Sequence, residues 1–288
     1  MSDFRPRRSV LYLPASNDRA LEKARSIPCD ALILDIEDAV APQAKAAARD
    51  AACAAAVSGD YGHREITIRV NGADTQWHND DLAAACAAGP DAIVVPKVNS
   101  ADAVLALVDA MSAHGAPEHT RLWAMVETPA AMLHAEEIAS ASERLTVLVM
   151  GTNDLAKELY AEHVPGRQPL LTGLGLALLA ARATGKAILD GVYNDVQDID
   201  GFLAECRQGR EMGFDGKTLI HPGQVAGANA AFAPSDDAID DARGILQAWE
   251  DGAGSGVVTY RGRMIESLHV ESARRTLSMY DAIRNLDD

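Results

Sequence analysis

The sequence has few aromatic residues, few cysteines and no long hydrophobic run. Aromatic residues make up 5% of its 288 positions, which favours closely packed, alanine-rich helices over a β-sandwich. No apolar stretch approaches the roughly 18 residues of a membrane span, and the charged N-terminus lacks the apolar core of a signal peptide. The four cysteines are scattered without metal-ligand spacing. We therefore expect reduced thiols and a cytoplasmic location.

A net positive charge is also lacking. The 42 acidic residues outnumber the 26 basic ones, and the formal net charge is −16. A field of this sign repels nucleic acid and anionic membranes, so we expect neither as a partner. The short basic segment of Arg5, Arg7 and Arg8 is too small to reverse it. An anionic small molecule can still bind where a few arginines are placed locally.

Eight short β-rich runs alternate with alanine-rich stretches of helical period. The runs are Ser9–Pro14, Ala31–Ile36, Glu65–Asn71, Ala92–Val98, Arg121–Glu127, Thr146–Met150, Ala187–Tyr193 and Lys217–His221. Each has little polar alternation, as expected of a parallel strand buried on both faces. Eight such units favour a closed (β/α)8 TIM barrel over an open sheet. We predict a catalytic barrel domain over residues 1–225 and a C-terminal helical extension or lid over residues 226–288.

Two carboxylates follow consecutive predicted strands. Glu127 ends the fifth strand, and Asp154 comes shortly after the sixth. A barrel brings such residues side by side at its C-terminal mouth. Two carboxylates with water suit Mg²⁺, which prefers oxygen ligands and keeps open positions for substrate. The sequence thus predicts a magnesium site, although each residue alone could instead cap the helix that follows it.

Charged residues also end the second, third and fourth strands. Arg69 is a candidate to grip a substrate carboxylate through two parallel hydrogen bonds, or else to pair with the acids of the second strand. Those acids are Asp35, Glu37 and Asp38. We expect Asp35 and Glu37, with Lys97, to form an outer layer that orients the metal waters and Arg69.

In order and register, these motifs resemble the citrate lyase β-subunit family, which includes malyl-CoA and citramalyl-CoA lyases within the phosphoenolpyruvate/pyruvate barrel superfamily. The resemblance extends from Arg8 to about Thr276. Its carriers are Arg8–Pro14, Leu34–Val40, Ile68–Gly72, Val94–Lys97, Val126–Pro129, Gly151–Leu155, Ala187–Gly191 and Gly213–Pro222.

The resemblance implies a magnesium-dependent barrel, usually a homotrimer or homohexamer, that acts on acyl-thioesters. By motif position, Glu127 and Asp154 correspond to the family's metal ligands, where Glu127 also contacts substrate, and Arg69 corresponds to its carboxylate-binding arginine. Many members carry a catalytic aspartate after a Met-Ile pair near the C-terminus. Glu266 occupies that position here, one methylene longer. We expect Glu266 to transfer the proton, with Asp38 as the alternative.

A second departure lies at Leu171–Leu178, where typical members carry an arginine- and serine-bearing helix start. This sequence is apolar and glycine-rich there, and the substrate's acyl group is accordingly left open.

The combined prediction is a carbon–carbon lyase with a Mg²⁺ cofactor, which cleaves a citryl-, malyl- or citramalyl-CoA-like thioester to an oxo acid and acetyl-CoA or a homologue. Three alternatives remain. The first is a metal-dependent aldolase that releases pyruvate without CoA. The second is a citrate lyase β subunit that works on an acyl carrier protein. The third is a binding protein without catalytic activity.

Overall fold

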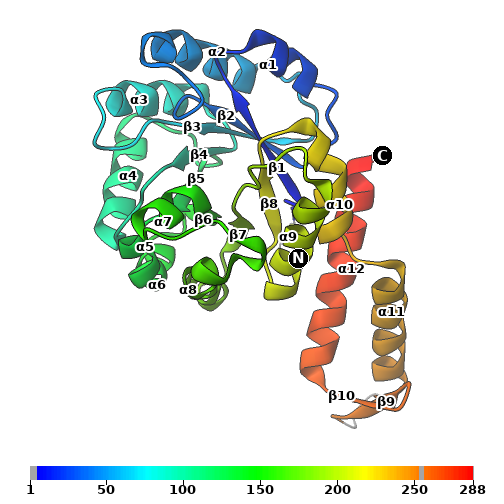
Figure 1. Ribbon diagram of the computed structural model, residues 1–288. Coiled ribbons are helices and arrows are strands. Elements are labelled where there is room, and N and C mark those ends of the chain that lie inside the picture. The colour runs from blue at the N-terminus through cyan, green and yellow to red at the C-terminus, as the bar shows by residue number, and fades with distance from the viewer. Residues whose placement is uncertain (1–4, 253–255, 288) are drawn as a thin grey trace. The chain divides into compact units, whose positions relative to one another are not determined.

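The computed structural model describes residues 5–252 and 256–287 of the chain. Eight parallel strands form a closed barrel in the order β1 to β8, with β8 returning to pair with β1 (Figure 1). The strands are β1 (Ser9–Pro14), β2 (Ala31–Asp35), β3 (Glu65–Arg69), β4 (Ala92–Val95), β5 (Arg121–Val126), β6 (Leu145–Met150), β7 (Ala187–Asp190) and β8 (Gly216–Leu219). This arrangement confirms the predicted TIM barrel.

Helices follow the strands and cover the outside of the barrel. They are α1 (Asp18–Ala24), α2 (Lys45–Val57), α3 (His78–Ala88), α4 (Ala101–Ala113), α5 (Pro129–Leu133), α6 (Ala135–Ser140), α7 (Thr152–Glu158), α8 (Leu171–Ala183), α9 (Ile199–Met212) and α10 (Val225–Phe232). Short 3₁₀ turns lie at η1 (Pro42–Ala44), η2 (Pro165–Leu170) and η3 (Pro222–Gln224). Ser100 and Thr128 cap α4 and α5 through their hydroxyl groups, which accept backbone N–H bonds.

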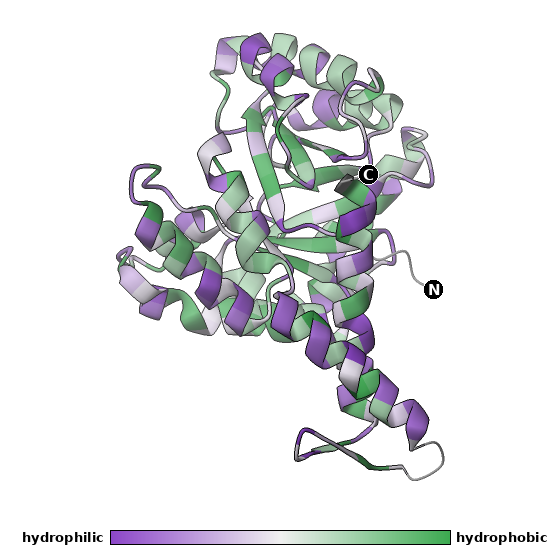
Figure 2. Cartoon of the chain, turned by 90° about the vertical axis from the view of Figure 1, so that its right-hand side faces the viewer, coloured by the Kyte–Doolittle hydropathy of each residue, from purple (hydrophilic) through white to green (hydrophobic). Residues whose placement is uncertain are grey.

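The barrel interior is filled by apolar side chains from successive strands. Val10, Ile33, Val94, Trp123 and Val149 belong to one buried cluster and are fully excluded from solvent. The strands are largely hydrophobic and the helices carry both classes of residue (Figure 2). Burial of apolar surface stabilises the folded state by about 25 cal/mol per Å². The continuous apolar runs of the sequence therefore stabilise the closed sheet.

Most predicted strands extend too far at their C-terminal ends. The fourth was predicted to reach Val98, but β4 ends at Val95; the seventh was predicted to reach Tyr193, but β7 ends at Asp190. The polar residues at these ends leave the hydrogen-bonded ladder and enter the loops. They are the residues that the barrel presents at its C-terminal face.

The chain divides into two compact units, Arg7–Ala231 and a second unit that joins the N-terminal residues up to Pro6 with the chain from Phe232 onward. The second contains α11 (Asp236–Asp251), a hairpin of β9 (Val258–Tyr260) and β10 (Arg263–Ile265), and α12 (Ser267–Asp287). Ala242, Ile245, Ile265, Val270 and Ala273 form its own buried core. Residues 1–4 of the predicted barrel domain and 253–255 of the predicted extension lie outside the described residues, and the functional division into domain and lid stays a prediction.

Within the described part of the chain, no helix is both long and apolar enough to span a membrane. The four cysteines are free thiols; three are buried and Cys53 is half-buried.

Candidate active site

The predicted site residues of the barrel gather where the strands end. Asp35 and Arg69 are the last residues of β2 and β3, and their strands pair at this register. Lys97 follows β4 by two residues, Glu127 follows β5 directly, and Asp154 lies in the first turn of α7, after β6. Because all eight strands are parallel, these ends meet at one face of the barrel, where TIM-barrel active sites occur.

Arg69 is held firmly by acids of the second strand. Its Nε and Nη2 donate to the two oxygens of Asp35 at 2.7 and 2.8 Å. Its Nη1 lies 2.7 Å from Glu37, and its guanidinium stacks 4.8 Å from the ring centre of Tyr12. The arginine is 7% exposed, and these acids raise its pKa against the effect of burial. The two-pronged geometry expected for a substrate carboxylate is thus occupied by Asp35, while Nη1 lies between Glu37 and Asp38.

The other two acids of this loop differ in environment. Burial raises the pKa of Glu37 to about 7, although Arg69 opposes the shift. Glu37 Oε2 is buried and lacks hydrogen-bond geometry to any partner, despite its short distance from Arg69. Asp38 is 71% exposed, and its carboxylate lies 3.6 Å from Arg69 Nη1. Asp35 therefore orients Arg69, and Glu37 carries an unsatisfied oxygen beside it; their place in an outer layer around a metal stays a prediction.

Glu127 is almost completely buried, at 2% exposure. Its Oε1 accepts the backbone N–H of Lys97 at 2.8 Å. Burial, reinforced by the nearby charge of Asp154, raises its pKa to about 8. Space for the carboxylate comes from Gly151, since a Cβ there would collide with the Cβ and Oε2 of Glu127. The capping alternative for Glu127 is wrong, because Thr128 caps α5.

Lys97 links the two candidate metal ligands. Its N–H holds Glu127, while its ammonium lies 3.9 Å from Asp154 Oδ1. Burial tends to lower the pKa of Lys97, but the carboxylates of Asp154, Glu127 and Glu37 outweigh it and raise the value. Its backbone is left-handed, with φ of +53°. Such a conformation is uncommon for a residue with a side chain and frequent at functional sites.

The donor set fits magnesium better than a metal held by protein ligands alone. Among the described residues, no group of three or more His, Cys, Asp or Glu side chains is arranged to hold a metal. Mg²⁺ is commonly bound by one or two carboxylates, with waters and substrate oxygens completing the shell. Glu127 and Asp154 supply such a pair: one is buried, and the other has a side chain that is 27% exposed. Asp154 does not cap α7: it lies in the first turn of this helix, and the N-cap residue is Gly151.

Glu266 belongs to the second unit. It lies between β10 and α12, is half-buried, and its backbone N–H donates to His269 Nδ1 at 3.1 Å. Its carbonyl accepts the N–H groups of His269 and Val270 at the start of α12. The carboxylate is therefore presented at a helix start, and its role in proton transfer stays a prediction.

A buried ionic cluster in the barrel wall was not foreseen. Asp190 at the end of β7 accepts Arg167 Nη1 at 2.6 Å and Lys217 Nζ at 3.1 Å, and Lys217 also bonds Glu205. Both cations are buried, and Arg167 adopts a φ of +53° after Gly166. The segment Leu171–Leu178 lacks the arginine of typical family members, but the preceding turn η2 supplies one in Arg167. The signal available in the sequence was a lysine inside the apolar eighth strand.

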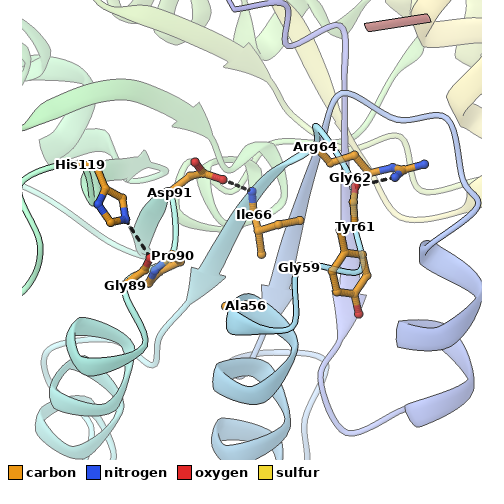
Figure 3. A pocket seen from close by; sticks show the side chains of 10 residues that line it. All are labelled: Ala56, Gly59, Tyr61, Gly62, Arg64, Ile66, Gly89, Pro90, Asp91 and His119. Atoms are coloured by element: carbon orange, nitrogen blue, oxygen red, sulfur yellow. Dashed lines mark hydrogen bonds between the residues drawn. The ribbon is translucent and has the colours of Figure 1, made fainter. Parts of the chain in front are cut away.

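Two other hollows lie away from Arg69, Lys97, Glu127 and Asp154. One, of about 230 Å³, lies at the N-terminal ends of β3 and β4 (Figure 3). There Asp91 accepts the N–H of Ile66, and His119 bonds the carbonyl of Gly89. The other, of about 420 Å³, lies between η2 and α9, where the Tyr193 hydroxyl donates to Asp198. Both have charged residues in their lining, such as Arg64 in the first and Arg167 in the second.

Family models match the chain over most of its length. The HpcH/HpaI aldolase/citrate lyase model matches residues 8–222, and a model described as a C–C bond lyase of the TIM-barrel fold matches residues 175–280. A (3S)-malyl-CoA thioesterase of Cereibacter sphaeroides is 51% identical over 96% of both chains. The citrate lyase subunit beta of Escherichia coli is 35% identical over 95% of this chain and 93% of its own.

Solved structures show the same likeness. The crystal structure of the protein CitE from Mycobacterium tuberculosis, in complex with magnesium, acetoacetate and coenzyme A, superposes with a TM-score of 0.78. It is 29% identical, and the match covers 96% of this chain and 98% of that one. A citrate lyase beta subunit from the same organism, complexed with oxaloacetate and magnesium, has a TM-score of 0.68 at 30% identity and covers 80% of this chain and 98% of its own.

Proposed function

The chain belongs to the HpcH/HpaI aldolase/citrate lyase family, a family of carbon–carbon lyases, and from this membership we propose its reaction. The protein is a magnesium-dependent lyase that cleaves a short 3-hydroxyacyl-CoA of the malyl type. The products are an oxo acid and acetyl-CoA or a homologue. This is the reaction class that the sequence predicted, and the malyl-like acyl group is proposed from the similarity to a (3S)-malyl-CoA thioesterase.

The observation that carries the proposal is the junction of Glu127, Lys97 and Asp154 at the barrel mouth. One lysine bonds the first carboxylate through its backbone and faces the second through its ammonium. The carboxylate pair suits a magnesium ion that also takes substrate oxygens. The CitE structures that contain magnesium with acetoacetate, pyruvate or oxaloacetate support the same combination of metal and oxo acid.

In the cleavage direction, a base accepts the hydroxyl proton, the O–H electron pair forms the new carbonyl, and the bond between C2 and C3 of the acyl chain breaks with its electron pair remaining on C2. That carbon then takes a proton and becomes the methyl group of acetyl-CoA. Magnesium, held by Glu127 and Asp154, would supply Lewis-acid polarisation of the developing carbonyl. Asp35 fixes the plane of the Arg69 guanidinium, and Arg69 is the proposed contact for the substrate carboxylate. Glu266 is the proposed proton donor to the methyl carbon.

Thioester hydrolysis is a second candidate, favoured by the 51% identity to a (3S)-malyl-CoA thioesterase. There, water adds to the thioester carbonyl, the carbon–sulfur bond breaks, and every carbon–carbon bond stays intact. Both reactions need the same short, carboxylate-bearing CoA ester. They differ in the bond that breaks, so their products separate them.

The test is product analysis. Purified protein is incubated with (3S)-malyl-CoA and citramalyl-CoA, with Mg²⁺ or with EDTA. Lyase activity yields glyoxylate or pyruvate with acetyl-CoA, only when Mg²⁺ is present. Malate or citramalate with free CoA would instead establish the hydrolase. Turnover restricted to an acyl-carrier-protein thioester would assign the chain to a citrate lyase complex, and turnover of a CoA-free hydroxy-oxo acid would indicate an aldolase.

We further propose a homotrimer or homohexamer and a cytoplasmic location, in keeping with the family resemblance. Light scattering of the purified chain checks the first, and fractionation of the producing cell checks the second.

A further inference from the structure

The helix turn that carries Asp154 is bonded to the loop after β7. Asn153, which precedes Asp154, forms a reciprocal pair of hydrogen bonds with Asn194. The amide nitrogen of Asn153 donates to the side-chain oxygen of Asn194 at 3.0 Å, and the nitrogen of Asn194 donates to the oxygen of Asn153 at 2.8 Å. The two residues are 41 positions apart, so this pair of amides joins two loops that the sequence separates.

A buried contact joins the same two loops. Thr152, the first residue of α7, is 4% exposed, and a Cβ at Gly191, directly after β7, would collide with its side chain. The carbonyl of Gly191 is bound by Nζ of Lys217, a fully buried residue of β8 that also pairs with Asp190. The loop after β7 is therefore anchored to the barrel wall where it begins, and it contacts the Asp154 turn at two places.

The two proposed metal ligands are held in different ways. Glu127 is buried, and its carboxylate accepts the backbone N–H of Lys97 at 2.8 Å. The side chain of Asp154 is 27% exposed, and the ammonium of Lys97 lies 3.9 Å from its Oδ1, beyond hydrogen-bond length. The position of the Asp154 carboxylate therefore depends on the backbone that carries it, and the loop after β7 contacts that backbone's neighbouring side chains.

We propose that Asn194 is a positioning residue, which sets the place of Asp154 for the magnesium ion through its amide pair with Asn153. This inference rests on the metal site of the proposed function. Mg²⁺ needs near-ideal octahedral geometry, with oxygen ligands at about 2.0–2.1 Å, whereas Ca²⁺ accepts longer and more variable contacts. A small displacement of Asp154 therefore weakens Mg²⁺ binding more than Ca²⁺ binding. Replacing either asparagine removes no charge, so the electrostatic attraction for both ions stays the same.

The test uses Asn194→Ala, Asn153→Ala and the double variant of the full chain, each titrated by calorimetry with MgCl₂ and, separately, with CaCl₂. Each single variant should bind Mg²⁺ more weakly by at least about fivefold, which corresponds to roughly 1 kcal/mol, and should bind Ca²⁺ within about twofold of wild type. The double variant should bind Mg²⁺ no more weakly than either single variant, because both changes remove the same pair. Gln197→Ala, which removes an exposed amide from the same loop, should change neither affinity.

Three results would overturn the role of Asn194 and leave the proposed function standing. In the first, Asn194→Ala binds Mg²⁺ as wild type does. In the second, Mg²⁺ and Ca²⁺ binding weaken equally, which shows a general loosening of the loops instead of the placement of one ligand. In the third, the losses of the two single variants add in the double variant, which shows that the two amides act separately. A wild-type chain that binds no Mg²⁺ would refute the metal site of the proposed function and the inference with it.

Discussion

Asp35 binds Arg69 through two hydrogen bonds of 2.7 and 2.8 Å between buried side chains at the ends of paired strands. Arg69 is therefore held in place by the barrel itself, without any contact to substrate. Breaking a buried ion pair is costly because the remaining charge has no partner. The same contact fixes the plane of the guanidinium, whose Nη1 lies beside Glu37 and Asp38.

Arg69→Lys should lower the free energy of unfolding by about 1–3 kcal/mol, since one ammonium cannot replace the two-pronged bond. Turnover should also fall strongly, because the cation moves away from the substrate. Arg8→Lys is the matched control: Arg8 makes the same two-pronged contact with Asp30 at the start of β1. It should cost similar stability and leave turnover intact. If Arg69→Lys retains wild-type oxo-acid binding and turnover, Arg69 is structural only.

Gly151→Ala should weaken magnesium binding more than tenfold while the barrel stays folded. The added methyl group would collide with Glu127 and move its carboxylate. Gly175→Ala in α8 is the control, since a Cβ there meets open space, and alanine favours a helix by up to about 1 kcal/mol. Calorimetry and thermal unfolding measure both variants. Wild-type magnesium affinity in Gly151→Ala would show that Glu127 is not a ligand.

Glu127→Gln should stabilise the metal-free protein increasingly as the pH rises. The pKa of Glu127 increases on folding, from 4.5 to about 8. The stability from its protonated form is therefore complete below about pH 4.5 and is lost as the pH rises through 8. Glutamine cannot ionise, so its advantage should grow to as much as ~5 kcal/mol, at about 1.4 kcal/mol per pKa unit.

Denaturant unfolding in EDTA at pH 5, 7 and 9 measures this advantage. Glu158→Gln, on the exposed surface of α7, should show no such trend. An advantage for Glu127→Gln that stays constant across this range would mean that Glu127 is ionised throughout.

The sequence predicted the barrel because each strand is a continuous apolar run. The spacing of apolar residues is enough to distinguish such runs from the helices between them. β1 was predicted with its observed bounds, Ser9–Pro14. Glu127 and Asp154 could be found because parallel strands deliver their ends to one face. Strand ends were overestimated where polar residues such as Lys97 turn into loops.

Side-chain partners were harder to predict, because they depend on rotamers and on contacts distant in sequence. The sequence left Arg69 open between substrate and Asp35, and the structure shows the pair with Asp35. The contact between Arg167 and Asp190 spans 23 positions and needs a left-handed turn that no local pattern announces. The left-handed backbone conformation of Lys97 could not be predicted from the sequence for the same reason.

Glu266→Gln should remove most turnover, by about 10²–10⁴-fold, which is the usual contribution of a general acid–base group. Binding of magnesium and oxo acid should stay nearly unchanged, because the amide keeps the shape of the side chain. Glu271→Gln, at an exposed position of α12, is the control. Wild-type turnover in Glu266→Gln would pass the proton-transfer role to Asp38.

Mixed oligomers show which chain Glu266 serves. Glu266→Gln and Arg69→Ala chains are each inactive under this account. Activity recovered on mixing them would show that the carboxylate acts in a neighbouring subunit, whereas no recovery would favour its own chain.

The most direct test of the account is a magnesium titration of wild type, Glu127→Ala and Asp154→Ala, followed in the same samples by turnover of malyl-CoA. Wild type should bind one Mg²⁺ per chain. Each variant should lose magnesium binding and activity together while it keeps the far-ultraviolet circular dichroism of a folded barrel. If both variants bind Mg²⁺ with wild-type affinity, the metal lies elsewhere and the proposed site at the barrel mouth is wrong.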